Sequence, residues 1–270
     1  MQLFLKATVL SLKPGQMPQI KRGLKIRTMK KILSIPLVAL LFTVNFNATA
    51  KSVTTSSTKF SDDERDVRNF SGVAAGGPIN VVVTLGSTES CRFEGDADAI
   101  STLITEVKGN VLVIRPQNSW TSWEHKYENK KITAYITAKT ISSLTMSGSG
   151  NMLVKGNINT RTFSAVISGS GTITANAKAD DLSAVISGSG KLNINGSADD
   201  AKVVISGSGN FSGSNFSVDN LSSTLSGSGT INIKADNSIK AVISGSGNIN
   251  YSGNATVEKT VIGSGRIRKI

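Results

Sequence analysis

A four-residue motif, Ser-Gly-Ser-Gly, recurs through the second half of this chain and restricts its fold more than any other feature. The motif first occurs at residues 147–150, and its last copy, at 262–265, begins with isoleucine. Successive copies are 18–21 residues apart, with first glycines at Gly148, Gly169, Gly188, Gly207, Gly227, Gly245 and Gly263. A repeat of this length indicates a solenoid, in which each unit stacks on the next and none buries its apolar residues alone.

The residues around each motif alternate between apolar and polar, which predicts strands. Near Gly188, one parity holds Leu182, Ala184, Ile186, Gly188, Gly190, Leu192 and Ile194. The other parity holds Ser183, Val185, Ser187, Ser189, Lys191 and Asn193. A period of two is the period of a strand. We therefore expect an all-β chain, folded as a single-stranded parallel β-helix with one repeat per coil, and the usual crossover preference predicts a right-handed helix.

Stacked coils place equivalent residues about 4.8 Å apart, so each repeat position becomes a column. The inward column two residues before the first glycine predicts a core, with Met146, Ile167, Ile186, Ile205, Leu225, Ile243 and Val261. The motif glycines share this inward parity, so we expect a sharp corner that only glycine fits. The motif serines share the outward parity. A nucleophilic serine needs a base, and the repeats contain no histidine, so we expect no catalytic residue there.

An outward column of β-branched residues lies three residues before each first glycine. Its members are Thr145, Val166, Val185, Val204, Thr224, Val242 and Thr260. A soluble monomer usually avoids an exposed apolar stripe, although β-branched residues also favour strands. We therefore expect Val166, Val185 and Val204 to be covered, either by another part of this chain or by a partner such as a second copy. We favour the first option, because the Trp120–Tyr127 loop is available as a cover.

Aspartates precede the strands at regular positions. Asp180, Asp199 and Asp219 each stand eight residues ahead of a first glycine and should stack. Calcium held between coils is one interpretation. Aspartate is also an ordinary turn former, and we favour turns. No metal site and no cofactor are expected.

The N-terminal half is less regular. Residues 70–85 resemble a degenerate coil, and strands are expected at 111–114 and 132–137. Apolar residues at 100, 103, 104 and 107 have helical spacing, so we expect an amphipathic helix over 98–108. Cys91, the only cysteine, alternates with charged residues. We interpret it as a small buried hydrophobe rather than a nucleophile.

The irregular insertion at 117–131 contains both tryptophans and the only histidine. Trp120, Trp123 and Tyr127 could form a sugar-stacking platform beside nearby lysines. We favour a loop whose aromatic residues fold back over the solenoid, and we expect His125 to be a surface residue.

The formal net charge of +12 reflects mainly the first 50 residues. They contain eight Lys or Arg and no acid, whereas 51–270 contain 22 Lys or Arg and 18 Asp or Glu. Residues 29–50 combine lysines, an apolar run and Ala48-Thr49-Ala50, which is typical of a cleaved signal peptide. Residues 51–69 are expected to be a flexible lead-in and 70–270 the β-helix domain. We expect no nucleic-acid partner and no transmembrane span in the mature chain.

The chain resembles the head GIN domain family of autotransporter-type adhesin heads. The resemblance rests on Gly76-Gly77-Pro78-Ile79-Asn80, on Ile132-Thr133-Ala134-Tyr135-Ile136 and on the repeats, in that order, and covers 70–270. It implies a parallel β-helix, an exported location and an adhesive role, and it implies no catalytic residues.

These observations predict an exported, non-enzymatic protein that presents a rigid repeat surface for adhesion or assembly in the cell envelope. It would lie in the periplasm, on the outer membrane or outside the cell, with a glycan or an envelope protein as partner. The alternative is a polysaccharide-cleaving lyase or hydrolase, which would need a carboxylate pair or a metal-assisted base in a cleft.

Overall fold

The computed structural model describes residues 60–117, 127 and 130–270. The expected signal peptide, residues 51–59 of the expected lead-in, Trp120, Trp123 and His125 lie outside the described residues. Contacts divide the chain into Met1–Thr54 and Thr55–Ile270, and every described residue belongs to the second unit. Strand β1, Phe60–Arg65, lies within the expected lead-in, so the ordered fold begins before Phe70.

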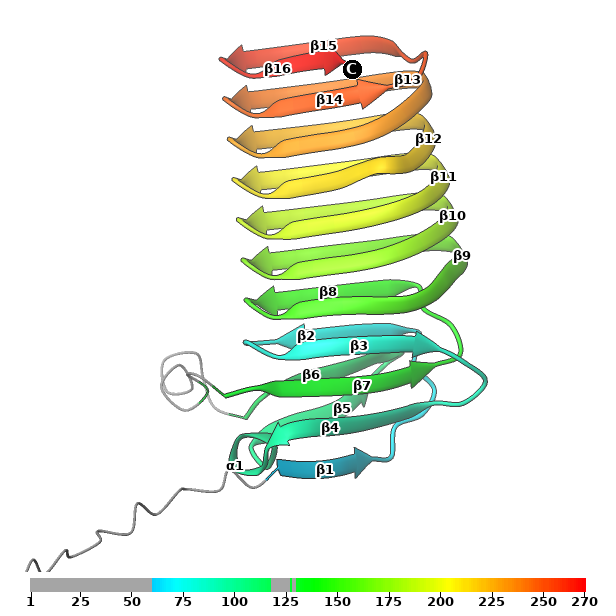
Figure 1. The fold of residues 1–270 in the computed structure, drawn as a ribbon. Coiled ribbons are helices and arrows are strands. Elements are labelled where there is room, and N and C mark those ends of the chain that lie inside the picture. Colours follow the sequence, from blue (N-terminus) through cyan, green and yellow to red (C-terminus); the bar gives the residue numbers. More distant parts are fainter. Residues whose placement is uncertain (1–59, 118–126, 128–129) are drawn as a thin grey trace, which may run out of the picture. The chain divides into compact units, whose positions relative to one another are not determined.

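Five long strands form the regular part of the solenoid (Figure 1). Each begins just after one glycine motif and ends at the first glycine of the next: β9 Asn151–Gly169, β10 Thr172–Gly188, β11 Lys191–Gly207, β12 Asn210–Gly227 and β13 Thr230–Gly245. Consecutive strands pair in parallel with motif opposite motif. The parallel β-helix predicted from the repeat is confirmed.

Each coil has two walls joined by a broad bend. The pairing of β13 shows both walls, because Thr230–Lys234 pairs with β14, Asn248–Ser252, and Ser238–Gly245 pairs with β15, Thr256–Gly263. We call the segment that follows a glycine corner the first wall and the segment that leads into the next corner the second wall. Strand β16, Arg266–Lys269, continues the first wall by pairing with β14.

The core lies between the two walls and consists of the predicted columns. Ile167, Ile186 and Ile205 of the second wall are fully buried, as are Ile173, Leu192 and Phe211 of the first. Neighbours in each column are direct partners in the parallel ladder. Alternation in the sequence therefore becomes a continuous apolar interior through β9 to β13.

The glycine corner is confirmed, and its two glycines meet different obstacles. Gly188 has φ +108°, and a Cβ there would lie 2.6 Å from the carbonyl oxygen of Gly169. A Cβ on Gly190 would lie 2.4 Å from Cγ2 of Ile167, inside the core. The Ser189 amide also donates to the Gly169 oxygen at 3.0 Å, which ties one corner to the corner below it.

The first coil is placed out of sequence order. Strand β2, Gly72–Gly76, lies between β6, Val111–Pro116, and β8, Ser143–Gly148. Strand β3, Asn80–Leu85, likewise lies between β7, Ile132–Ala138, and β9. The segment predicted as a degenerate coil is therefore a real coil. The chain leaves it to build the layer below, β6 and β7, and then returns above it.

The helix predicted over 98–108 is wrong. Only Ala97–Ile100 is helical, as α1, and Leu103–Lys108 forms strand β5. Strand β5 pairs antiparallel with β6, and the two-residue connection between Lys108 and Val111 contains Gly109 at φ +62°. A Gly-Asn pair between two β-branched runs is a hairpin signal. Pairing with β6 buries Leu103 and overrides the helical spacing.

Strands that run antiparallel close the N-terminal end of the stack. Strand β4, Ser90–Asp96, pairs antiparallel with β7 and with β1. Cys91 of β4 is fully buried, as predicted, and burial raises the pKa of its thiol to about 12. Arg65 of β1 crosses this end: its guanidinium donates to the carbonyl oxygens of Leu103, at 2.9 Å, and Ile100, at 3.3 Å.

Replacing Arg65 with glutamine should lower the free energy of unfolding by about 1–3 kcal/mol, because two carbonyl oxygens lose a charged donor. Arg68→Gln is the matched control, since the Arg68 side chain is 74% exposed and pairs with the exposed Asp66. It should cost less than about 1 kcal/mol. Urea unfolding measures both variants, and equal losses would show that Arg65 does not close the end of the stack.

Candidate functional site

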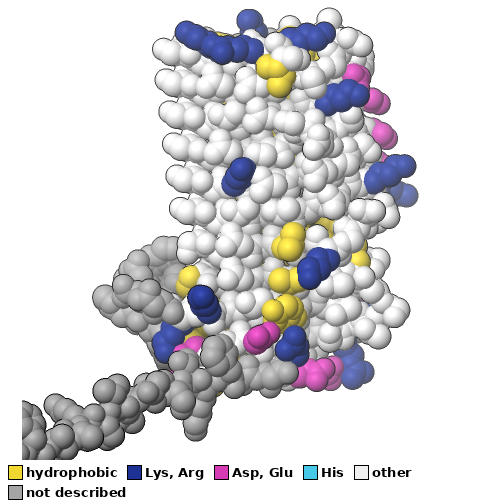
Figure 2. Space-filling model, viewed as in Figure 1, with side chains coloured by type: hydrophobic (Ala, Val, Ile, Leu, Met, Phe, Trp, Pro, Cys, Tyr) yellow, Lys and Arg dark blue, Asp and Glu magenta, His cyan; other side chains and the backbone are white. Residues whose placement is uncertain are grey.

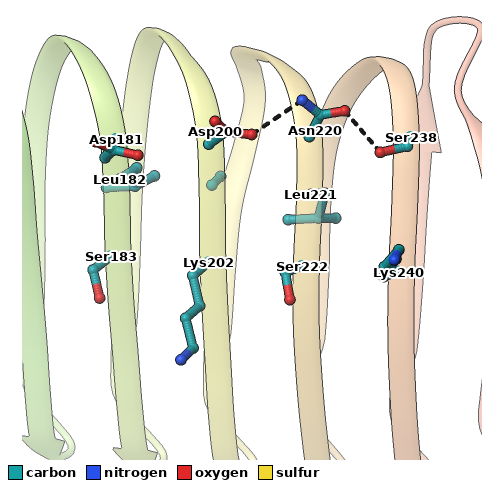
Figure 3. A pocket seen from close by; sticks show the side chains of 11 residues that line it. Asp181, Leu182, Ser183, Asp200, Lys202, Asn220, Leu221, Ser222, Ser238 and Lys240 are labelled. Carbon is teal, nitrogen blue, oxygen red and sulfur yellow. Dashed lines mark hydrogen bonds between the residues drawn. The ribbon is translucent and has the colours of Figure 1, made fainter.

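An open groove crosses β10, β11, β12 and β13 on the second wall, beside the broad bend (Figure 3). Its volume is about 370 Å³. Each coil contributes the residues at the same repeat positions, which form two polar rows with apolar residues between them. The lining residues are Asp181, Leu182, Ser183, Asp200, Ala201, Lys202, Asn220, Leu221, Ser222, Ser238 and Lys240.

Strand alternation builds the rows. In β10, Leu182 is buried, so its neighbours Asp181 and Ser183 point outward. The same pattern recurs in β11 and β12 because Asp181 pairs with Asp200, which pairs with Asn220. We call Asp181, Asp200, Asn220 and Ser238 the bend row, and the second row, Ser183, Lys202, Ser222 and Lys240, the lysine row. Figure 3 shows the bend row next to the curve of the ribbons.

Hydrogen bonds join the bend row along the stack. The Asn220 amide donates to Asp200 Oδ1 at 3.0 Å. Asn220 Oδ1 accepts from Ser238 Oγ at 2.7 Å and from Asn237 Nδ2 at 2.9 Å. These bonds hold Asn220 in one orientation. Hydrogen bonds therefore hold the carboxylate of Asp200, the amide of Asn220 and the hydroxyl of Ser238 in place along the row.

Cations occur on every second coil of the lysine row. Lys202 and Lys240 alternate with Ser183 and Ser222, so about 10 Å, two coil spacings, separates the lysine positions. Lys240 Nζ lies 3.8 Å from Glu258 Oε2 of β15. The groove thus combines carboxylates, amides, hydroxyls and ammonium groups on an open surface, which suits hydrogen bonding to a polar ligand.

The aspartates stack as expected, but they do not form turns. Asp180 and Asp181 lie within β10, and Asp199 and Asp200 lie within β11. The strand continues past the bend, so these residues begin the second wall. In the part of the chain that the structure describes, no group of three or more His, Cys, Asp and Glu side chains could hold a metal ion.

A second groove, of about 410 Å³, lies on the approach to the same bend. It contains an asparagine ladder, Asn157, Asn176 and Asn195, whose members pair across β9, β10 and β11. Asn195 Nδ2 donates to Asn176 Oδ1 at 3.0 Å. Polar ladders therefore line both sides of the bend.

Of the three aromatic residues predicted from sequence as a ligand platform, only Tyr127 is among the described residues. Trp120 and Trp123 lie outside them. Tyr127 is buried, and its hydroxyl hydrogen-bonds to Thr102 Oγ1, next to α1 at the N-terminal end. The buried hydroxyl shows that Tyr127 supports the fold there and does not form an exposed platform.

The valine column exists in the predicted register on the second wall. Val166, Val185 and Val204 are consecutive partners, and all three are partly buried. Val242, whose partners are Thr224 and Thr260, is 46% exposed. The three consecutive valines therefore form an apolar stripe on the outer surface.

Comparison with known proteins identifies the family. The model of the family described as "Putative auto-transporter adhesin, head GIN domain" matches residues 69–255. The chain belongs to the head GIN domain family. The comparison with curated proteins found no match. The described part of this head GIN chain contains no helix that could span a bilayer.

Solved structures share the fold of this head GIN chain. A "putative adhesin" from Bacteroides fragilis is similar with a TM-score of 0.69 and 24% identity, covering 79% of this chain and 98% of that one. A "putative lipid binding protein" and a "putative adhesin" from Parabacteroides distasonis, 21% and 22% identical, each give a TM-score of 0.62 with the same coverage. At these identities the likeness shows the fold alone.

Proposed function

We propose that this chain is an exported, non-enzymatic protein of the cell envelope that binds a glycan or an envelope protein through the surface of its solenoid. Membership of the head GIN domain family supports an adhesive role. The observation that carries the proposal is the groove across four coils, with its fixed bend row and its lysine row. An open groove that repeats along the stack, with polar rows beside an apolar floor, suits a long ligand better than an enclosed small molecule.

The groove can be tested by screening the purified protein on a glycan array and against envelope extracts. The double variant Lys202→Gln, Lys240→Gln should weaken binding at least tenfold, because hydrogen bonds to charged groups are each worth about 1.5–3 kcal/mol. Lys155→Gln, Lys191→Gln is the matched control, since it removes two exposed lysines from the first wall. Equal binding by the two double variants would show that the groove is not the site.

The groove does not favour the alternative of a polysaccharide-cleaving hydrolase. Glycosidases place two carboxyl groups on either side of the scissile bond. Asp181 and Asp200 instead lie in one row, on adjacent coils (Figure 3). An assay for reducing ends or unsaturated products released from a polysaccharide tests this alternative. Activity that is lost in Asp181→Asn or Asp200→Asn would contradict the proposed non-enzymatic function.

Export should remove residues 1–50. We expect the secreted or envelope-bound protein to begin at Lys51, because Ala48 and Ala50 follow the apolar run as a cleavage site does. N-terminal sequencing of the protein from the producing cell checks this. An intact N-terminus retained in the membrane would contradict it.

We also propose that the valine stripe is a contact face between two copies of the chain. Tyr127, which could have helped to cover the stripe from within the chain, is instead buried beside α1. The triple variant Val166→Thr, Val185→Thr, Val204→Thr should change a dimer into a monomer, since hydroxyls replace apolar contacts across the interface. Analytical ultracentrifugation checks this, and thermal unfolding follows stability. A variant that is less stable but sediments as the parent does would indicate an internal cover instead.

A further inference from the structure

The last described coil, β15 and β16, leaves core positions open at the end of the stack. Val261 continues the inward column of Ile243, which is fully buried, yet Val261 is 37% exposed. Ile267 continues the column of the buried Ile249 and is itself only partly buried. This end therefore exposes apolar side chains whose equivalents in the preceding coils are buried.

Two lysines occupy inward columns in this coil. Lys259 continues a column whose preceding members are all buried: Ala165, Ala184, Val203, Ser223 and Ala241. Lys269 follows Ile233 and Tyr251 in a first-wall column. A further coil stacked here would bury both ammonium groups without partners, at a cost of several kcal/mol each. Inward-pointing charges are a known means of preventing strand addition, so the end is poorly suited to another coil or a second copy.

The rim of the same coil adds two more cations and two exposed aliphatic residues. Arg266 and Arg268 point outward from β16. Ile262 takes the place of the motif serine and is 67% exposed, and Ile270 is 73% exposed. Figure 2 shows Lys and Arg side chains gathered over the β15–β16 end.

Opposing charge at this end is small. Glu258, the only acidic side chain of β15 and β16, lies 3.8 Å from Lys240 Nζ. Among the described residues, no ion pair involves Lys259, Arg266, Arg268 or Lys269. Four cations without an ion pair in the described part of the chain therefore share this coil with exposed aliphatic side chains.

We propose that the β15–β16 end docks on an anionic lipid surface. The four cations would contact lipid phosphates, while Ile262, Ile270 and the apolar stems of the lysines enter the boundary with the acyl chains. The lysine ammonium groups of Lys259 and Lys269 would stay hydrated in a headgroup layer, whereas an added strand would bury them. The site is separate from the groove and does not depend on the groove's ligand.

Vesicle sedimentation tests the proposal. The purified protein should sediment with phosphatidylcholine vesicles that contain phosphatidylglycerol, and not with pure phosphatidylcholine, and added salt should weaken the binding. Each cation removed should weaken it about fivefold, so Lys259→Gln, Lys269→Gln should bind far less. The double variant Ile262→Ser, Ile270→Ser should also bind vesicles less. The first of these changes should leave the fold intact, because it introduces the serine that the other coils have at that position.

The control Lys155→Gln, Lys191→Gln removes the same charge from the first wall and should bind vesicles as the parent does. Equal loss in this control would show that only net charge matters and would overturn the proposal, as would failure to bind anionic vesicles. Dimers that dissociate in Lys259→Gln, Lys269→Gln would overturn it in favour of a second copy. The groove variant Lys202→Gln should weaken binding of the groove ligand and keep vesicle binding if the two sites are separate. Lys240 is left unchanged in this test because it pairs with Glu258 of β15.

Discussion

Replacing Gly188 with valine should lower the free energy of unfolding by about 2–4 kcal/mol, through a strained backbone and a clash at the corner. At φ +108°, a Cβ at this position would lie 2.6 Å from the Gly169 carbonyl oxygen. That oxygen already accepts the Ser189 amide, so it cannot move without loosening the stack. Urea unfolding followed by circular dichroism measures the loss.

Ser189→Ala is the matched control, because Ser189 is exposed at the same corner. It should cost less than about 1 kcal/mol, as the loss of one exposed hydroxyl. If both variants lost the same stability, the corner would not require glycine at position 188.

Replacing Phe211 with alanine should lower the free energy of unfolding by about 3–5 kcal/mol, because the change leaves a cavity in the core. Phe211 is fully buried between Leu192 and Ile231 of its column. Its ring lies over Gly213, where a Cβ would be 2.5 Å from the ring carbon Cε1. Glycine offers no side chain that could move into the space.

Leu153→Ala provides the comparison, since Leu153 is 40% exposed on the first wall. It should cost less than about 1 kcal/mol. Guanidinium unfolding of both variants checks the difference. A small loss for Phe211→Ala would mean that neighbouring coils close the cavity, and the walls would then be less rigid than the ladder implies.

The repeats could be predicted from the sequence because every coil repeats the same alternation. Ile167, Ile186 and Ile205 occupy one column in both the sequence alignment of the motifs and the structure. An error in aligning one repeat would have been evident from the neighbouring repeats. The register, the core columns and the glycine corners were therefore fixed by redundancy.

The N-terminal part has no such redundancy. Ile100, Leu103, Ile104 and Val107 have helical spacing, yet β5 is a strand because it pairs with β6. The position of β2 between β6 and β8 depends on contacts between segments 39 and 71 residues apart, as in Gly72–Val111 and Gly72–Ser143. Local periodicity carries no information about such pairing.

The candidate site could be predicted only in part. The stacking of the aspartates followed from their equal distance to the motif. The groove itself depends on where the coil bends, and the sequence suggested a turn where Asp181 and Asp200 instead begin the second wall. The lysine row was visible as an alternation of lysine and serine, but only the register of β10 to β13 shows that it borders the bend row.

The out-of-order first coil affects how the protein would respond to a pulling force. Strands β10 to β13 pair only with neighbouring coils, so tension applied at the C-terminal end would peel them off one at a time. Strands β6 and β7 lie beneath β2 and β3 although they follow them in the chain, so pulling them out must break the ladders with β2 and β5 and with β3 and β4 together. If the repeats carry the proposed adhesive contact, that contact would shorten gradually under load while the N-terminal part of the fold stays intact.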